Sequence, residues 1–70
     1  MTNEEIKRRL LKTVDQTISD GRKMSRLTQI EQEFYIVRSI WAIGRAALNL
    51  LSNEDYFKFK EEVTKRGYSL

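Results

Sequence analysis

The sequence predicts an all-α fold, a three-helix unit with a long apolar central helix that is part of a homo-oligomeric helical bundle. The pattern Thr/Ser-x-x-Glu/Asp, which is typical of a capping box at a helix N-terminus, begins at Thr2, Thr28 and Ser52. Each occurrence precedes apolar residues at three- and four-residue spacing. The chain has 70 residues and no Pro, so we expect one helical domain spanning residues 1–70.

The first helix is predicted over residues 3–20. Aliphatic residues recur at every fourth position from Ile6 to Ile18, which forms one apolar stripe on an otherwise polar helix. Gly21 follows and suits the left-handed C′ position that ends many helices. The next six residues are a short basic connection, and a link of this length usually joins antiparallel neighbours.

The second helix is predicted over residues 29–51 and carries two adjacent apolar rows. The first row is Ile30, Phe34, Val37, Trp41, Gly44, Leu48 and Leu51, and the second is Ile36, Ile40, Ile43, Ala47 and Leu50. Both rows alternate steps of three and four residues, the spacing of a coiled-coil seam. The polar stripe between them is narrow and consists of Glu31, Arg38, Arg45 and Asn49. A helix this apolar is expected at the centre of the fold.

The third helix is predicted over residues 53–66, with Tyr56, Phe59 and Val63 on its inner edge and Gly67 at its end. A narrow first helix and a short third helix are not expected to cover both rows of the second. We therefore expect a homo-oligomer, and the alternative is a loosely covered monomer. The expected interface residues are Val37, Ile40, Trp41, Gly44, Ala47, Leu48 and Leu51.

The composition argues against catalysis and against a metal or other cofactor. The chain has no His and no Cys, which removes the usual general base, the usual thiol nucleophile and the commonest metal ligands. The paired acids, such as Glu61 and Glu62, precede basic residues by four positions and are expected to form solvated helix ion pairs. Arg38 and Arg45 interrupt the longest apolar stretch, so no membrane span is predicted. Without a signal peptide, the expected location is cytoplasmic.

The basic charge is concentrated before the second helix. The net charge of the chain is +3, and residues 1–28 hold seven basic against four acidic side chains. A basic loop that leads into a helix N-terminus suits an anion such as phosphate. The candidate ligand-binding residues are Arg22, Lys23, Arg26 and Thr28, joined by Tyr35 and Arg38 from a neighbouring subunit. The alternative is a solvated loop in which Glu31 occupies the cap.

The stretch from Arg22 to Ile40 resembles a helical hairpin of small phage proteins that sequester the cyclic nucleotide messengers of antiviral defence. The resemblance is carried by Arg22, Thr28, Ile30, Glu31, Phe34, Val37, Arg38 and Ser39, and by the opening residues from Met1 to Ile6. It implies an oligomer that binds a cyclic di- or trinucleotide between protomers, with an aromatic ring stacked on a base. The sequence departs from the family in having no aromatic residue before Phe34 and no Gly inside its first helix.

The expected function is therefore that of a small non-enzymatic binding protein, a phage-type oligomer that takes an anionic ligand at the basic loop. The first alternative is an interaction module that inhibits or adapts a host protein through apolar surface on the second and third helices. The second alternative is a DNA-binding regulator. Nucleic acid ranks below the other partners because the third helix, which would enter a groove, has no net charge.

Overall fold

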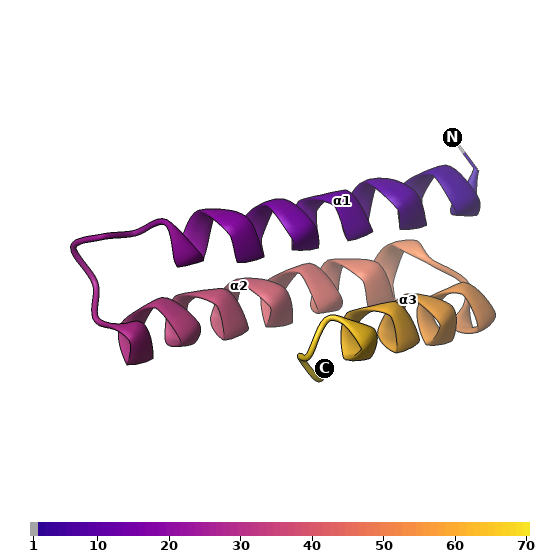
Figure 1. Cartoon of the computed structure of the whole chain (residues 1–70). Helices are drawn as coiled ribbons and strands as arrows, with labels where there is room; N and C mark the ends of the chain where they lie inside the picture. Colours follow the sequence, from indigo (N-terminus) through magenta and orange to yellow (C-terminus); the bar gives the residue numbers. More distant parts are fainter. Residues whose placement is uncertain (1) are drawn as a thin grey trace.

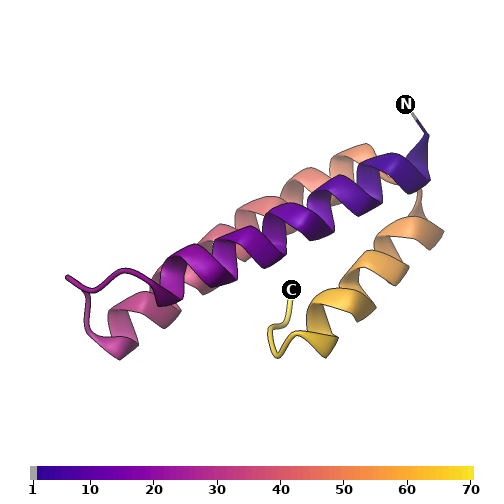
Figure 2. The ribbon, with the colours of Figure 1, turned by 45° about the horizontal axis from the view of Figure 1, so that its top comes forward.

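The computed structural model describes residues 2–70, and within this range the chain forms three α-helices and no strand. The helices are α1 (Asn3–Arg22), α2 (Gln29–Leu50) and α3 (Asn53–Lys65). α1 and α2 form an antiparallel hairpin, and α3 returns along the second half of α2 (Figure 1). From a second angle, α1 still follows α2 along its length while α3 diverges toward its own C-terminal end (Figure 2). The all-α fold predicted from the sequence is confirmed.

Each helix begins at the residue that its cap predicts. The hydroxyls of Thr2, Thr28 and Ser52 accept hydrogen bonds from the backbone N–H three residues later, at 3.2, 3.2 and 3.3 Å. At Thr28 the box is reciprocal, because the Glu31 carboxylate accepts the Thr28 N–H at 2.9 Å. These bonds satisfy N–H groups that have no partner within the helix.

The prediction that Gly21 ends the first helix is wrong. α1 continues through Gly21 to Arg22, and the glycine with a positive φ is Gly67, at +91°, which follows α3 as expected. Gly21 is buried where α1 meets α2. A Cβ built on it would overlap the Ile36 side chain and lie 3.3 Å from the Tyr35 ring. Gly21 is therefore needed for the close approach of two helices.

We expect Gly21→Ala to destabilise the fold by about 1–3 kcal/mol, because the added methyl group forces the tightly placed Ile36 side chain to move. The effect opposes helix propensity, on which Ala exceeds Gly by about 1 kcal/mol. Thermal unfolding followed by circular dichroism measures the change. Lys12→Ala, at an exposed position of the same helix, is the control and should stay within about 0.5 kcal/mol of the wild type. A Gly21→Ala variant as stable as this control would contradict the close approach.

The core lies where the three helices meet, and each helix contributes to it. Fully or almost fully buried are Val14 from α1, Ile36, Ile40 and Ala47 from α2, Leu51 after α2, and Phe59 and Val63 from α3. Partly buried residues, among them Leu10, Ile18 and Ile43, surround this cluster. Ile36, Ile40 and Ala47 of the second predicted row thus face inward, whereas Leu50 of that row is 56% exposed.

This arrangement corrects part of the expected oligomer interface. Ile40, Gly44, Ala47 and Leu51 are buried inside the chain, so they offer no surface to another subunit. The Leu70 side chain covers Gly44, where an added Cβ would come within 2.6 Å of it. The other three expected interface residues, Val37, Trp41 and Leu48, remain partly or largely exposed.

Among the described residues, no helix combines the length and the apolar character that crossing a membrane requires.

Candidate functional site

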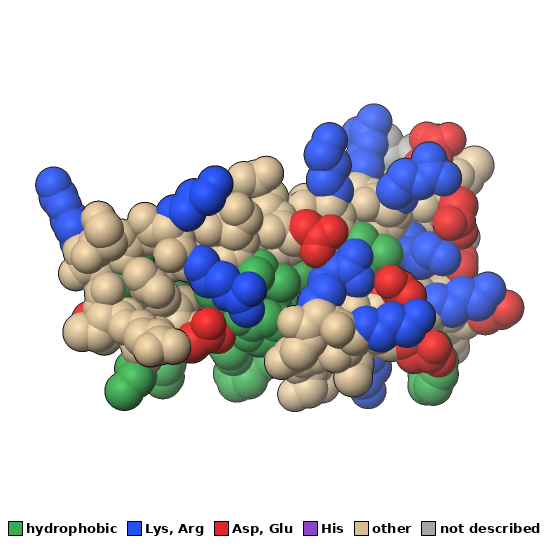
Figure 3. Space-filling view, in the orientation of Figure 1, with side chains coloured by type: hydrophobic (Ala, Val, Ile, Leu, Met, Phe, Trp, Pro, Cys, Tyr) green, Lys and Arg blue, Asp and Glu red, His purple; other side chains and the backbone are tan. Residues whose placement is uncertain are grey.

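The most prominent feature of the surface is the side of α2 that faces away from the core. We define the α2 outer face as Ile30, Phe34, Val37, Trp41 and Leu48. Ile30 is 78% exposed, Phe34 64%, Trp41 57% and Leu48 56%. Hydrophobic side chains project from the edge of the molecule below α2 (Figure 3). These residues belong to the first apolar row of the sequence, whose other two members, Gly44 and Leu51, are buried.

The N-terminal half of this face is shallowly hollowed. A groove of about 500 Å³ runs along α2 from Gln29 to Trp41, with Phe34 and Val37 between them and Arg38 at its rim. A groove with an apolar floor and few polar groups suits an apolar side-chain row from another helix.

The C-terminal segment holds Trp41 in place. The indole N–H donates a hydrogen bond to the Ser69 carbonyl at 3.1 Å, and Leu70 lies against Gly44 beside it. The polar atom of the ring is therefore satisfied within the chain, while more than half of the residue stays exposed. A ring with a fixed orientation loses little conformational freedom when a partner covers it.

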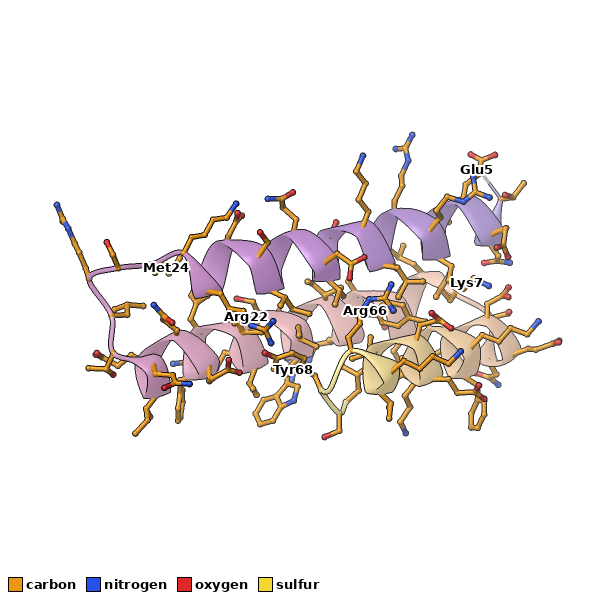
Figure 4. All side chains as sticks on the ribbon, viewed as in Figure 1. Glu5, Lys7, Arg22, Met24, Arg66 and Tyr68 are labelled. Carbon is orange, nitrogen blue, oxygen red and sulfur yellow. The ribbon has the colours of Figure 1, made fainter. Side chains whose placement is uncertain are left out.

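A polar network next to this segment joins the end of α1, α2 and the C-terminal residues. The Tyr68 hydroxyl donates to Glu33 at 2.8 Å and accepts from Arg22 at 3.4 Å. Arg22 also lies 3.9 Å from the Glu33 carboxylate. The two side chains point toward one another, Arg22 from the end of α1 and Tyr68 from the C-terminal segment (Figure 4). Burial, and then the hydrogen bond to Glu33, raise the pKa of Tyr68 above its usual value.

Because the pKa of Tyr68 is raised on folding, its contribution to stability is present below the ordinary phenol pKa and is lost as the pH rises through the folded value. We expect the C-terminal segment to loosen above about pH 10 and to release the Trp41 indole. Trp41 is the single tryptophan, so its fluorescence reports the change. Tyr68→Phe retains the other two tyrosines and should lack this step; an identical alkaline transition in both proteins would contradict the assignment.

The residues predicted to bind an anion are only partly assembled. Thr28 and Glu31 close the capping box on each other, so the chain's own carboxylate occupies the start of α2. The hydrogen bond from the Thr28 N–H lowers the pKa of Glu31, which keeps this carboxylate ionised. Arg22 is engaged with Glu33 and Tyr68. This is the alternative arrangement that the sequence left open for the loop.

The remaining candidates are exposed but distant from one another. Lys23 and Arg26 are exposed on the loop, and within residues 2–70 neither forms an ion pair. Tyr35 lies against Gly21 and is 40% exposed. Arg38 is ten residues beyond Thr28 on α2, about 15 Å along the helix axis. A single chain therefore does not gather all six predicted residues into one site.

Comparison with protein-family models, curated proteins and solved structures found no match. The resemblance to phage proteins that sequester cyclic nucleotides therefore stays a prediction. Within the described residues, no group of three or more acidic, His or Cys side chains is placed to hold a metal ion. The α2 outer face remains the strongest candidate site.

Two of its members, Ile30 and Phe34, were missing from the candidate site residues derived from the sequence. Both had been placed in the first apolar row, but the expected interface included only the members of that row from Val37 onward. The sequence feature that could have revealed this exposed face is the presence of two apolar rows on one helix. α1 and α3 pack on one side of α2, so they bury Ile36 and Ile40 and leave Ile30 and Phe34 on the other side exposed.

Proposed function

We propose that this chain is a small, non-enzymatic protein-interaction module that binds an apolar helix on the α2 outer face. The observation that carries the proposal is the exposure of Ile30, Phe34 and Trp41 on one side of a single helix. Scattered exposed apolar residues are common on proteins, but a contiguous row of large ones marks a binding surface.

The free energy of burial favours such a function. Covering the exposed parts of Ile30, Phe34, Trp41 and Leu48 contributes roughly 1 kcal/mol or more for each side chain. Trp and other large residues near the centre of an interface commonly dominate its binding energy. The hydrogen bond to the Ser69 carbonyl already fixes the Trp41 ring, and Ile30 lies near the start of a capped helix. These side chains therefore lose little conformational entropy on binding.

Site-specific photo-crosslinking tests the proposal. p-Benzoylphenylalanine replaces Phe34 on the α2 outer face or, as a matched control, Phe57, which is 61% exposed on α3. After illumination of the cells that produce the protein, we expect protein adducts from position 34 and few or none from position 57. Equal yields at the two positions, or no adduct at position 34, would rule out docking on this face.

The anionic-ligand function has less structural support, because the Thr28 hydroxyl and the helix N-terminus that were to bind the ligand are engaged by Glu31. The exposed Lys23 and Arg26 are equally consistent with a solvated loop. A DNA-binding role has less support, because α3, the helix that would enter a groove, carries four acidic and three basic side chains. Docking of a helix on α2 is the function that the arrangement of side chains favours.

A further inference from the structure

We propose that the helix bound by the α2 outer face is α2 of a second copy of this chain, running antiparallel to the first. The inference rests on the proposed function and names its partner. It follows from two properties of α2, the spacing of its exposed apolar residues and the order of the charges beside them.

The spacing makes the face complementary to itself. Ile30, Phe34, Val37 and Trp41 follow one another at steps of four, three and four residues, and Leu48 comes seven residues after Trp41. Alternating steps of this kind place side chains along a nearly straight seam. α2 has 22 residues and is about 33 Å long, so two copies can pair over several turns.

The chain itself does not cover this seam along its whole length. Its C-terminal segment reaches Trp41 through the Ser69 carbonyl and Gly44 through Leu70. Ile30 and Phe34 lie further toward the start of α2 and remain more exposed than Trp41. The C-terminal segment therefore borders the seam at Trp41 and Gly44, while Ile30 and Phe34 before it and Leu48 after it stay open to a second helix.

The charges select the direction of pairing. Glu31, Arg38 and Arg45 are spaced by seven residues, so they form one row along one side of the seam, and all three are exposed. In a parallel pair the two-fold axis runs along the seam, so this row lies on opposite sides of the seam in the two copies and Glu31 does not face Arg45. In an antiparallel pair with its two-fold axis near Arg38, Glu31 of each chain lies beside Arg45 of the other.

The groups required for these contacts are available. Within the described residues, neither Arg38 nor Arg45 forms an ion pair in its own chain. Glu31 uses Oε1 to accept the Thr28 N–H, which leaves Oε2 for a partner. Only the two Arg38 side chains meet a like charge, at the axis, and a planar guanidinium is weakly hydrated and tolerates stacking. A two-fold pair with this pattern is closed and needs no third subunit.

Disulfide trapping tests both the partner and its direction. The natural chain has no Cys, so Glu31→Cys and Arg45→Cys each introduce a single thiol. The two purified variants are mixed and equilibrated in a glutathione redox buffer, and the disulfide products are separated by mass. A disulfide forms only where the two Cβ atoms can approach to about 4 Å. Circular dichroism checks that both variants remain helical, since the Thr28 hydroxyl still caps α2 in Glu31→Cys.

For an antiparallel pair we expect the mixed disulfide between positions 31 and 45 to exceed the two like disulfides together by about tenfold. A mixed disulfide that does not exceed the two like disulfides together would overturn the antiparallel arrangement and leave docking on α2 intact. Wild-type protein that sediments as a monomer at every accessible concentration would overturn self-pairing. In that case the crosslinks from position 34 test the proposed function separately. Adducts with another protein would support docking on the α2 outer face, and the absence of adducts would rule it out.

Discussion

Replacing Phe59 with alanine is expected to remove a large part of the stability of the fold. Phe59 is the largest fully buried side chain and lies among Val14, Ile36, Ile40 and Val63 in the core. Truncating a buried Phe to Ala costs about 3–5 kcal/mol in lost transfer free energy and in the cavity that remains. A chain of this size has a total stability of only about 4–10 kcal/mol. Circular dichroism and urea unfolding measure the loss directly.

The matched control is Phe57→Ala, two residues earlier on the same helix. Phe57 is 61% exposed, so the same substitution removes little buried area and improves helix propensity. We expect its free energy of unfolding to stay within about 1 kcal/mol of the wild type. Comparable losses in the two variants would contradict the assignment of Phe59 to the inside of α3 and Phe57 to the outside.

Phe34→Asp is expected to weaken pairing of the chain by about 100-fold or more while leaving the protomer folded. The substitution places a charge in the centre of the α2 outer face, where the paired state would bury it without a partner. Losses of 2–4 kcal/mol are usual at central aromatic positions of an interface, which corresponds to about 30- to 1,000-fold in the dissociation constant. Because Phe34 is 64% exposed in the single chain, the helices should be retained. Sedimentation velocity over a concentration series measures the dissociation constant.

Phe57→Asp makes the same chemical change at an exposed position of α3, outside the α2 outer face. It should pair as the wild type does, because the added charge stays in water. If Phe57→Asp dissociated the pair and Phe34→Asp did not, the interface would lie on α3. That outcome would return the function to the broader interaction surface on the second and third helices that the sequence suggested.

Local signals in the sequence were sufficient to place the helices. Each cap is made by a hydroxyl and a backbone N–H only three residues away, so its geometry does not depend on the rest of the fold. The starts at Asn3, Gln29 and Asn53 followed directly from Thr2, Thr28 and Ser52. The end of α1 did not, because Gly21 is compatible with both a left-handed cap and a crowded helix crossing.

At the predicted ligand site, the residue spacing in the sequence fitted two different arrangements. Thr28 and Glu31 have the same spacing whether they close a capping box on each other or leave the helix N-terminus open to an anion. Sequence alone could not decide between the two arrangements, since both use the same hydroxyl. The observed hydrogen bonds show that in this chain the carboxylate occupies the cap. Arg22 likewise had no visible partner until Tyr68, 46 residues later, came within reach.

The sequence by itself determined three capped helices, their approximate lengths and the presence of two apolar rows on the second. Only the tertiary structure decided which row is buried, because that depends on where α1 and α3 pack around α2. Their contacts bury Ile36 and Ile40 and leave Ile30 and Phe34 exposed. Hydrogen bonds within a helix connect residues that are close in sequence, so the sequence indicates where helices form. Burial depends on contacts between residues that are distant in sequence and meet only in the folded chain.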